Sequence, residues 1–255
     1  MMNLFDLTGR TALITGSSGG LGLAMSQALS DAGAAIVLHG RNQDKLREAA
    51  AQFASRDVEV ETLSFDVTCE ADVHRAFESL DERGITIDIL INNAGMQHRQ
   101  PMVELSLADW QKVIDTNLSA AFLVGQQVAR RLIEKGQGGK IINVGSLTSQ
   151  VARATVAPYT AAKGGIRLLT CSMAAEWAEH NIQANAIGPG YMLTDMTRAL
   201  SEDPTFDGWV KARTPSRRWG LPEDLASTVI YLAAPGSGYV NGQIIYVDGG
   251  MLAVL

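Results

Sequence analysis

Short apolar runs alternate with helical stretches along the whole chain, and this alternation constrains the fold more than any other feature of the sequence. Seven runs are of strand length and most are rich in Ile, Val and Leu, which suits strands covered on both faces. Strands that alternate with helices imply right-handed βαβ units. The sequence therefore predicts an α/β protein with one doubly wound domain, residues 1–255, and a seven-stranded parallel sheet. The predicted strands are residues 11–15, 35–39, 58–65, 87–92, 140–145, 182–187 and 243–247.

The clearest helical stretch follows Leu107. Apolar residues recur there at steps of three and four as far as Ile133, with charged and polar residues such as Gln127 between them. We therefore expect one long amphipathic helix whose single apolar stripe includes Phe122. Ser106 is expected to cap its first turn and Gly136 to follow its end.

Composition and charge argue against several classes of function. Lys and Arg total 21 and Asp and Glu total 27, a formal net charge of −6, so without basic runs the chain is a poor candidate for binding nucleic acid or an anionic membrane. No apolar run reaches the ~20 residues of a membrane-spanning helix, and the N-terminus lacks the apolar core of a secretory signal. Cys69 and Cys171 are far apart, which predicts free thiols in a reducing compartment. We expect a cytoplasmic protein without a metal site.

The stretch TGSSGGLG, residues 15–22, lies between the first predicted strand and a helix. Glycines at such a turn let the backbone approach a pyrophosphate, and the helix N-terminus stabilises its negative charge. The spacing is TGxxxGxG rather than GxGxxG. We expect a dinucleotide site of the Rossmann type, and the alternative is a tight turn with no ligand. The residues expected at the cofactor are Gly16, Ser17, Ser18, Gly20, Leu21 and Gly22.

The end of the second predicted strand indicates which dinucleotide binds. An acid there binds the ribose 2′-OH of NAD, whereas a basic residue fits the 2′-phosphate of NADP. Here Arg41 follows Gly40 and no acid precedes Asp44. A guanidinium pairs with phosphate in a forked geometry, so we expect NADP(H) in preference to NAD(H); the alternative is that Arg41 is a surface charge. Asp66 and Val67 are expected at the adenine end.

Tyr159 and Lys163 lie four residues apart in APYTAAKGG, residues 157–165, so a helix places both on one face. Free tyrosine has a pKa near ~10, which is too high for an efficient base at neutral pH. A nearby cation stabilises the phenolate and lowers that pKa. The pair therefore fits proton transfer to or from a substrate oxygen. The alternative is an exposed turn of helix with no chemistry.

Five motifs in order, each at a predicted strand end, resemble the short-chain dehydrogenase/reductase family over essentially the whole chain. The resemblance implies an NAD(P)-dependent oxidoreductase in which Tyr159 transfers the proton. It implies that Ser146 holds the substrate oxygen and that Lys163 tunes Tyr159 and binds the nicotinamide ribose. The motifs are the glycine turn, NNAG at 92–95, Ser146 thirteen residues before the Tyr159/Lys163 pair, IGPGYMLTDM at 187–196 and YVDGG at 246–250.

The same resemblance implies further roles. Asn117 would be the fourth catalytic member and hold a water that relays protons to Lys163; the alternative is an asparagine bonded to a helix backbone group. Ser149 competes with Ser146 but has the less typical spacing.

Family members often form tetramers through the two long helices after strands four and five. An apolar tail, MLAVL at 251–255, fits burial at a subunit contact, so we expect a homotetramer. The remaining implied cofactor contacts are Asn93, Ala94, Gly95, Pro189, Gly190 and Thr194.

The stretches NNAGMQHRQP, VARATVAPYTAAKGG and KARTPSRRWGLPEDL carry a narrower resemblance, to the gluconate 5-dehydrogenases of this family. This resemblance implies reversible conversion of D-gluconate to 5-keto-D-gluconate. A sugar acid carries a carboxylate and several hydroxyls, so its pocket needs a cation and hydrogen-bond donors. One alternative keeps the chemistry with another substrate, such as a 3-oxoacyl thioester, another polyol or a sugar. The other is a non-catalytic dinucleotide-sensing scaffold. The substrate-binding candidates are Gln97, His98, Arg99, Ser146, Arg153 and Tyr191.

Overall fold

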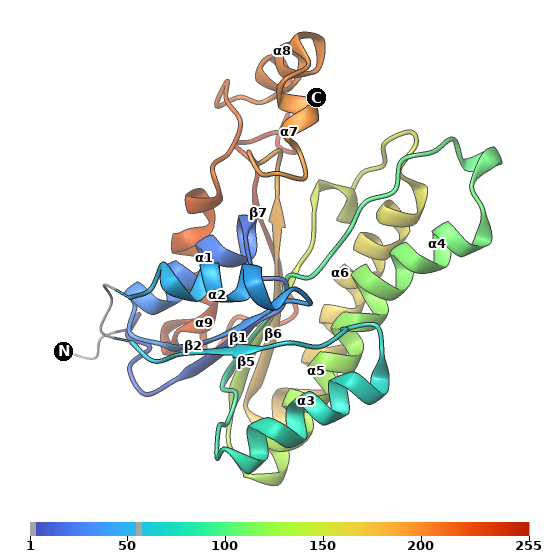
Figure 1. Ribbon diagram of the computed structural model, residues 1–255. Coiled ribbons are helices and arrows are strands. Elements are labelled where there is room, and N and C mark those ends of the chain that lie inside the picture. The colour runs from blue at the N-terminus through green and yellow to red at the C-terminus, as the bar shows by residue number, and fades with distance from the viewer. Residues whose placement is uncertain (1–3, 55–57, 255) are drawn as a thin grey trace.

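A seven-stranded parallel sheet forms the centre of the molecule in the computed structural model, which describes residues 4–54 and 58–254 (Figure 1). The strand order is β3-β2-β1-β4-β5-β6-β7, and every neighbouring pair is parallel. The predicted doubly wound sheet is thus confirmed. The order reverses between β1 and β4, and in such sheets ligands bind outside the carboxyl ends of the strands at that point. The strands are β1 (Thr11–Ile14), β2 (Ala35–His39), β3 (Val60–Leu63), β4 (Ile89–Asn92), β5 (Gly139–Val144), β6 (Ile182–Pro189) and β7 (Ile244–Val247).

Helices cover both faces of the sheet (Figure 1). Consecutive strand residues join different cores: Ala12 and Ile14 pack on one face and Leu13 on the other, because strand side chains alternate between faces. Burial on both faces accounts for the nearly continuous apolar strands. The first face carries α1 (Gly20–Asp31), α2 (Gln43–Ala51) and α9 (Ala226–Ala233), and the second carries α3 (Glu70–Glu82), α5 (Ala120–Glu134) and α6 (Ala157–Trp177).

Two short helices, α7 (Arg198–Ser201) and α8 (Pro204–Arg213), follow β6 and lie beyond its carboxyl end, with the C-terminus beside them (Figure 1). Tyr191, Phe206 and Trp219 pack together there, with ring centroids 5.5–6.3 Å apart. Met251 is buried against this cluster. This part of the chain therefore stands over the edge of the sheet where the strands end.

The long helix predicted after Leu107 is interrupted. It consists of α4 (Leu107–Ile114), a π-helical turn η2 (Asp115–Ser119) and α5. Both predicted ends are confirmed: Ser106 Oγ accepts a hydrogen bond from the Asp109 N–H at 3.0 Å, and Gly136 has a φ of +63° directly after the last turn. Asn117 lies inside the π-helical turn, a feature often found at functional sites.

Burial along α5 differs from the predicted stripe at two positions. A π turn accommodates one extra residue, which shifts the register of the helix beyond it. Phe122, expected on the apolar stripe, is 46% exposed, whereas Gln127, expected among the polar positions, is buried. The predicted stripe is confirmed at Ala121, Val128, Ala129 and Leu132, which are buried, and it was wrong at Phe122 and Gln127.

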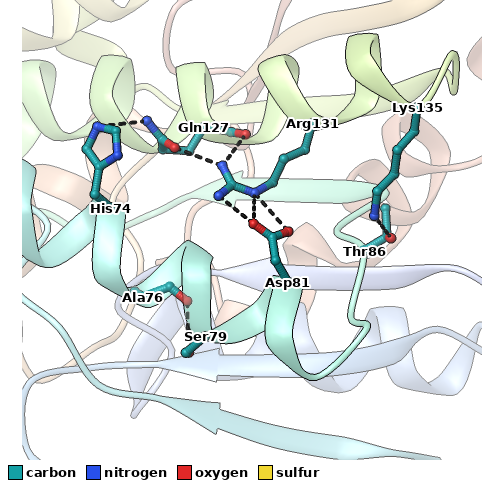
Figure 2. Close-up of polar contacts among 8 residues, drawn as sticks. All are labelled: His74, Ala76, Ser79, Asp81, Thr86, Gln127, Arg131 and Lys135. Carbon is teal, nitrogen blue, oxygen red and sulfur yellow. Dashed lines mark hydrogen bonds and ion pairs between the residues drawn. The ribbon is translucent and has the colours of Figure 1, made fainter.

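A polar network joins α3 to α5 around Gln127 (Figure 2). Arg131 of α5 binds both carboxylate oxygens of Asp81 in α3, with Nε–Oδ1 at 3.1 Å and Nη2–Oδ2 at 2.7 Å. Gln127 Oε1 accepts a hydrogen bond from Arg131 Nη1 at 2.8 Å, and its Nε2 lies 3.4 Å from His74 Nε2. These contacts satisfy the buried glutamine and fix α5 against α3.

Candidate functional site

The glycine turn between β1 and α1 has no space for side chains at two positions. Gly16 has a φ of +66°, and a Cβ there would lie 3.0 Å from the Ala94 Cα. A Cβ on Gly22 would lie 2.5 Å from the Gly16 carbonyl oxygen. Only glycine satisfies both constraints. The N–H groups in the first turn of α1 have no partner within the helix and remain available to an anion.

A pocket begins at this turn and reaches Tyr159 and Lys163. A cradle of glycines beside a helix N-terminus fits a dinucleotide pyrophosphate. Pro189 and Gly190 lie in a second pocket, which adjoins the first at Tyr159. Of the residues expected at the cofactor, those that line the first pocket are Gly16, Ser18, Gly20, Leu21, Asn93, Ala94, Gly95, Tyr159, Lys163 and Thr194.

Some residues expected at the cofactor do not line either pocket. Ser17 Oγ donates to the Ile14 carbonyl at 2.8 Å and accepts from the His39 N–H at 2.9 Å, so it faces the core. Arg41 is 78% exposed, and its Nη1 lies 3.7 Å from Asp66 Oδ2. Asp66 also accepts hydrogen bonds from Thr68, which are the main cause of its lowered carboxyl pKa. The residues outside the pocket linings are Ser17, Gly22, Arg41, Asp66 and Val67.

Asn117 is buried and bonded on both sides of its amide. Its Nδ2 donates to the Met96 and Val113 carbonyls, each at 2.9 Å, and its Oδ1 accepts from the Met96 N–H at 3.3 Å. The Val113 bond matches the helix-backbone alternative drawn from the sequence. The Met96 bonds join the π-helical turn to the segment after NNAG, beside the pocket that holds Lys163.

Ser146, Tyr159 and Lys163 meet at the carboxyl end of β5. Ser146 hydrogen bonds to the Tyr159 hydroxyl. Ser149, the competing serine, accepts a hydrogen bond from the Ser146 N–H at 3.2 Å and so serves the turn. Lys163 Nζ donates to the Val144 carbonyl at 2.6 Å and lies 5.5 Å from the Tyr159 ring centroid.

The electrostatics around Tyr159 differ from the expectation. Burial raises the pKa of Tyr159, while the Ser146 hydrogen bond and the charge of Arg99 oppose that rise. Burial also lowers the pKa of Lys163 to about 8. The predicted lowering of the Tyr159 pKa by Lys163 is therefore not found in the chain alone, where desolvation outweighs the nearby cations. The charge of Arg99 lowers the pKa of Tyr159, and Lys163 Nζ lies near the same ring.

The second pocket brings together five of the six substrate-binding candidates, including both arginines. Burial and then the charge of Arg153 lower the pKa of Arg99, so the two guanidinium groups influence each other. Arg153 Nη1 donates to the Tyr191 hydroxyl at 3.1 Å, and its Cζ lies 4.5 Å above the Phe206 ring. Arg99 makes no ion pair with any residue that the structure describes. The five are Gln97, Arg99, Ser146, Arg153 and Tyr191.

His98 is the candidate that the second pocket leaves out. Its Nε2 lies 3.1 Å from Gln100 Oε1, so the ring is engaged along the loop. Gln97 and Arg99, on either side of it, both line the second pocket, and the sequence alone does not distinguish His98 from Arg99.

Thr148 and Lys45 line the pockets but were not predicted from the sequence. Thr148 Oγ1 and Gln97 Oε1 are both buried and lack a hydrogen-bond partner within residues 4–54 and 58–254. Unsatisfied polar atoms in a pocket wall are free to hydrogen bond to a polar ligand or to water. Lys45 lines the dinucleotide pocket. Its position in the sequence, four residues after Arg41 and in the first turn of α2, could have suggested a role beside Arg41 in cofactor binding.

The part of the chain that the structure describes contains no cluster of His, Cys, Asp or Glu suited to a metal ion. Cys69 and Cys171 are free and exposed. No helix within the described ranges is long and apolar enough to span a bilayer.

Comparison with known proteins gives full-length matches. A family model described as enoyl-(acyl carrier protein) reductase matches residues 16–252. The chain is 43% identical over 253 residues to gluconate 5-dehydrogenase of Gluconobacter oxydans (strain 621H), covering 99% of this chain and 98% of that protein. It is 42% identical over 256 residues to 2-dehydro-3-deoxy-D-gluconate 5-dehydrogenase of Formosa agariphila, covering 100% and 97%. A crystal structure of a gluconate 5-dehydrogenase from Burkholderia cenocepacia J2315, in complex with NADP and tartrate, matches with a TM-score of 0.96 and 44% identity over 99% of each chain.

Proposed function

Because the chain belongs to the short-chain dehydrogenase/reductase family, we propose that it is an NADP(H)-dependent oxidoreductase that interconverts D-gluconate and 5-keto-D-gluconate. The observation that carries this proposal is the position of Arg99. A guanidinium without an ion-pair partner among the described residues lines the same pocket as Ser146 and Tyr159, and it suits a substrate carboxylate. The unsatisfied atoms of Gln97 and Thr148 suit sugar hydroxyls.

The proposed chemistry uses few groups of the protein. When bound, the nicotinamide supplies or accepts the hydride. In the reductive direction the Tyr159 hydroxyl donates a proton to the substrate oxygen, and in the oxidative direction the phenolate takes it back. Ser146 hydrogen bonds to the same oxygen and holds it toward Tyr159. Asn117 and Lys163 maintain the proton path behind the tyrosine.

For the cofactor, we propose that the glycine turn holds the pyrophosphate and that Arg41 and Lys45 hold the 2′-phosphate. Arg41 forms a surface ion pair with Asp66 at 3.7 Å, a contact that is weak enough to be exchanged for a phosphate. Lys45 already lines the pocket. NADP in the related Burkholderia structure supports this choice. We propose that Asp66 and Val67 lie at the adenine end of the bound cofactor.

We also propose that the protein is a homotetramer, that residues 1–255 form a single domain and that the protein is cytoplasmic. Phe122 on α5 and Leu168 on α6 are exposed, and large exposed apolar side chains on these two helices suit a subunit contact. The tail is partly covered by its own chain, since Met251 is buried while Val254 is exposed; Leu255 lies outside the described residues. Free, exposed thiols fit a reducing compartment. Sedimentation should give the mass of four chains, and a monomer would rule the tetramer out.

A spectrophotometric screen of NADPH oxidation tests the substrate. The compounds tested as substrates are 5-keto-D-gluconate, 2-keto-D-gluconate, 2-dehydro-3-deoxy-D-gluconate and an acetoacetyl thioester. The Tyr159→Phe variant is the inactive control. We expect 5-keto-D-gluconate to be the best substrate. The second candidate is 2-dehydro-3-deoxy-D-gluconate, which the name of the Formosa relative favours. Preference for the thioester would defeat the sugar-acid assignment and leave the family chemistry intact.

A further inference from the structure

His39, the last residue of β2, is 2% exposed and has no part in the chemistry proposed above. Its backbone N–H donates to Ser17 Oγ, and its carbonyl accepts from the Ser17 N–H, each at 2.9 Å. Its imidazole Nδ1 lies 3.0 Å from the Gly16 nitrogen, and its Nε2 lies 3.1 Å from the Phe65 carbonyl oxygen. The side chain thus bridges the glycine turn and the segment after β3.

These two partners define the protonation state of the ring. The Gly16 N–H can only donate, so Nδ1 must accept, and the Phe65 carbonyl can only accept, so Nε2 must carry the proton. An imidazolium would place one N–H against another at Gly16. The ring also packs on the Phe65 ring with centroids 4.1 Å apart, which limits its rotation.

Asn93 holds the other side of the same turn. Its Nδ2 donates to the Thr15 carbonyl at 2.9 Å and to the Gly16 carbonyl at 3.0 Å. The two peptide groups flanking the Gly16 Cα are therefore both fixed by side chains, the N–H by His39 and the carbonyl by Asn93. Gly16 has a left-handed backbone and lies four residues before Gly20, the first residue of α1, so its conformation sets where the free N–H groups of that turn point.

We propose that His39 is a positioning residue of the dinucleotide site, whose neutral Nε2–H tautomer anchors the glycine turn in the shape that binds the cofactor pyrophosphate. This inference rests on the proposed cofactor binding. Burial keeps the imidazole neutral by lowering its pKa to about 4, and of the charged groups that act on it Asp66 opposes this change and Arg41 adds to it.

Two substitutions separate the hydrogen bond from simple packing. In His39→Asn, the side-chain Oδ1 can take the place of Nδ1 and accept from Gly16, although the Phe65 contact is lost. In His39→Leu, volume is retained but the acceptor is gone. We expect fluorescence titration to show a Kd for NADPH about tenfold higher in His39→Leu, the cost of one hydrogen bond. His39→Asn should stay within about threefold of the unmodified protein, and kcat at saturating NADPH should change little in either variant.

Several outcomes overturn the inference. One is a His39→Leu variant with unchanged NADPH affinity, and another is an Asn variant as weak as the Leu variant, since packing alone then explains the loss. A fall in kcat with an unchanged Kd also contradicts a positioning role. Nitrogen NMR of the unmodified protein tests the tautomer without any variant: Nε2 should carry the proton at neutral pH, and a proton on Nδ1 rejects the bridge. Unmodified protein that binds no NADPH defeats the proposed function as well.

Discussion

Replacing His39 by asparagine should remove a specific part of the pH dependence of folding. Burial lowers the pKa of this imidazole from 6.5 to about 4 in the folded chain. In the unfolded chain the imidazole is solvated and binds a proton as the pH falls below its ordinary pKa. The unfolded state then holds more protons than the folded state, so the free energy of unfolding decreases as the pH falls. The loss begins near pH 6.5 and is complete below about pH 4.

The size of this effect follows from the two pKa values. A difference of one pKa unit corresponds to about 1.4 kcal/mol, so the full loss is about 3 kcal/mol. Between pH 7 and pH 4.5, roughly 2 kcal/mol of it should be expressed. Domains of this kind are stable by only about 5–15 kcal/mol, so the change is large enough to measure.

Urea unfolding followed by tryptophan fluorescence at the two pH values provides the assay. Carboxylates contribute to the pH dependence of both the unmodified protein and His39→Asn. The difference between their losses in free energy of unfolding therefore isolates the contribution of His39. Between pH 7 and pH 4.5, the free energy of unfolding of the unmodified protein should fall by roughly 2 kcal/mol more than that of His39→Asn. Equal losses in the two proteins would refute the claim that folding keeps this histidine neutral.

Three further predictions concern the cofactor and substrate pockets. Arg41→Ala and Lys45→Ala should each weaken NADPH binding about tenfold with little effect on NADH, because only NADPH carries the 2′-phosphate; calorimetry showing equal losses would contradict this. Arg99→Gln should move the rising, low-pH limb of the oxidation rate to higher pH, since it removes a charge that lowers the Tyr159 pKa, and an unmoved limb would exclude that influence. Thr148→Val should raise the KM for 5-keto-D-gluconate about tenfold and leave kcat nearly unchanged; an unaltered KM would remove Thr148 from the substrate contacts.

The sequence was sufficient to predict the sheet because burial on both faces leaves a strong apolar signal in the central strands, such as β1, β4 and β5. It did not reveal the π-helical turn, because one extra residue barely alters a pattern of threes and fours. The consequence appears only beyond that turn, where Phe122 is exposed and Gln127 is buried. Burial at these two positions therefore differs from the regular pattern, while Val128, Ala129 and Leu132 are buried as the pattern predicts.

The candidate site shows a similar division. Glycines 16 and 22 were predictable because a turn at a strand end restricts residue type. The direction of the Tyr159 pKa was not predictable from the spacing to Lys163, because burial and the distant Arg99 both act on it. Thr148 was missed since its importance lies in an unsatisfied hydroxyl, which only the three-dimensional arrangement reveals.

The most direct test of the account is the turnover of Tyr159→Phe with 5-keto-D-gluconate at saturating NADPH, measured beside its Kd for NADPH. Loss of a general acid typically costs about 10²–10⁴ in rate. We predict a fall in kcat of that order, with a Kd for NADPH within about threefold of the unmodified protein. A variant that keeps more than about a tenth of the turnover would contradict the role of Tyr159 as the proton donor.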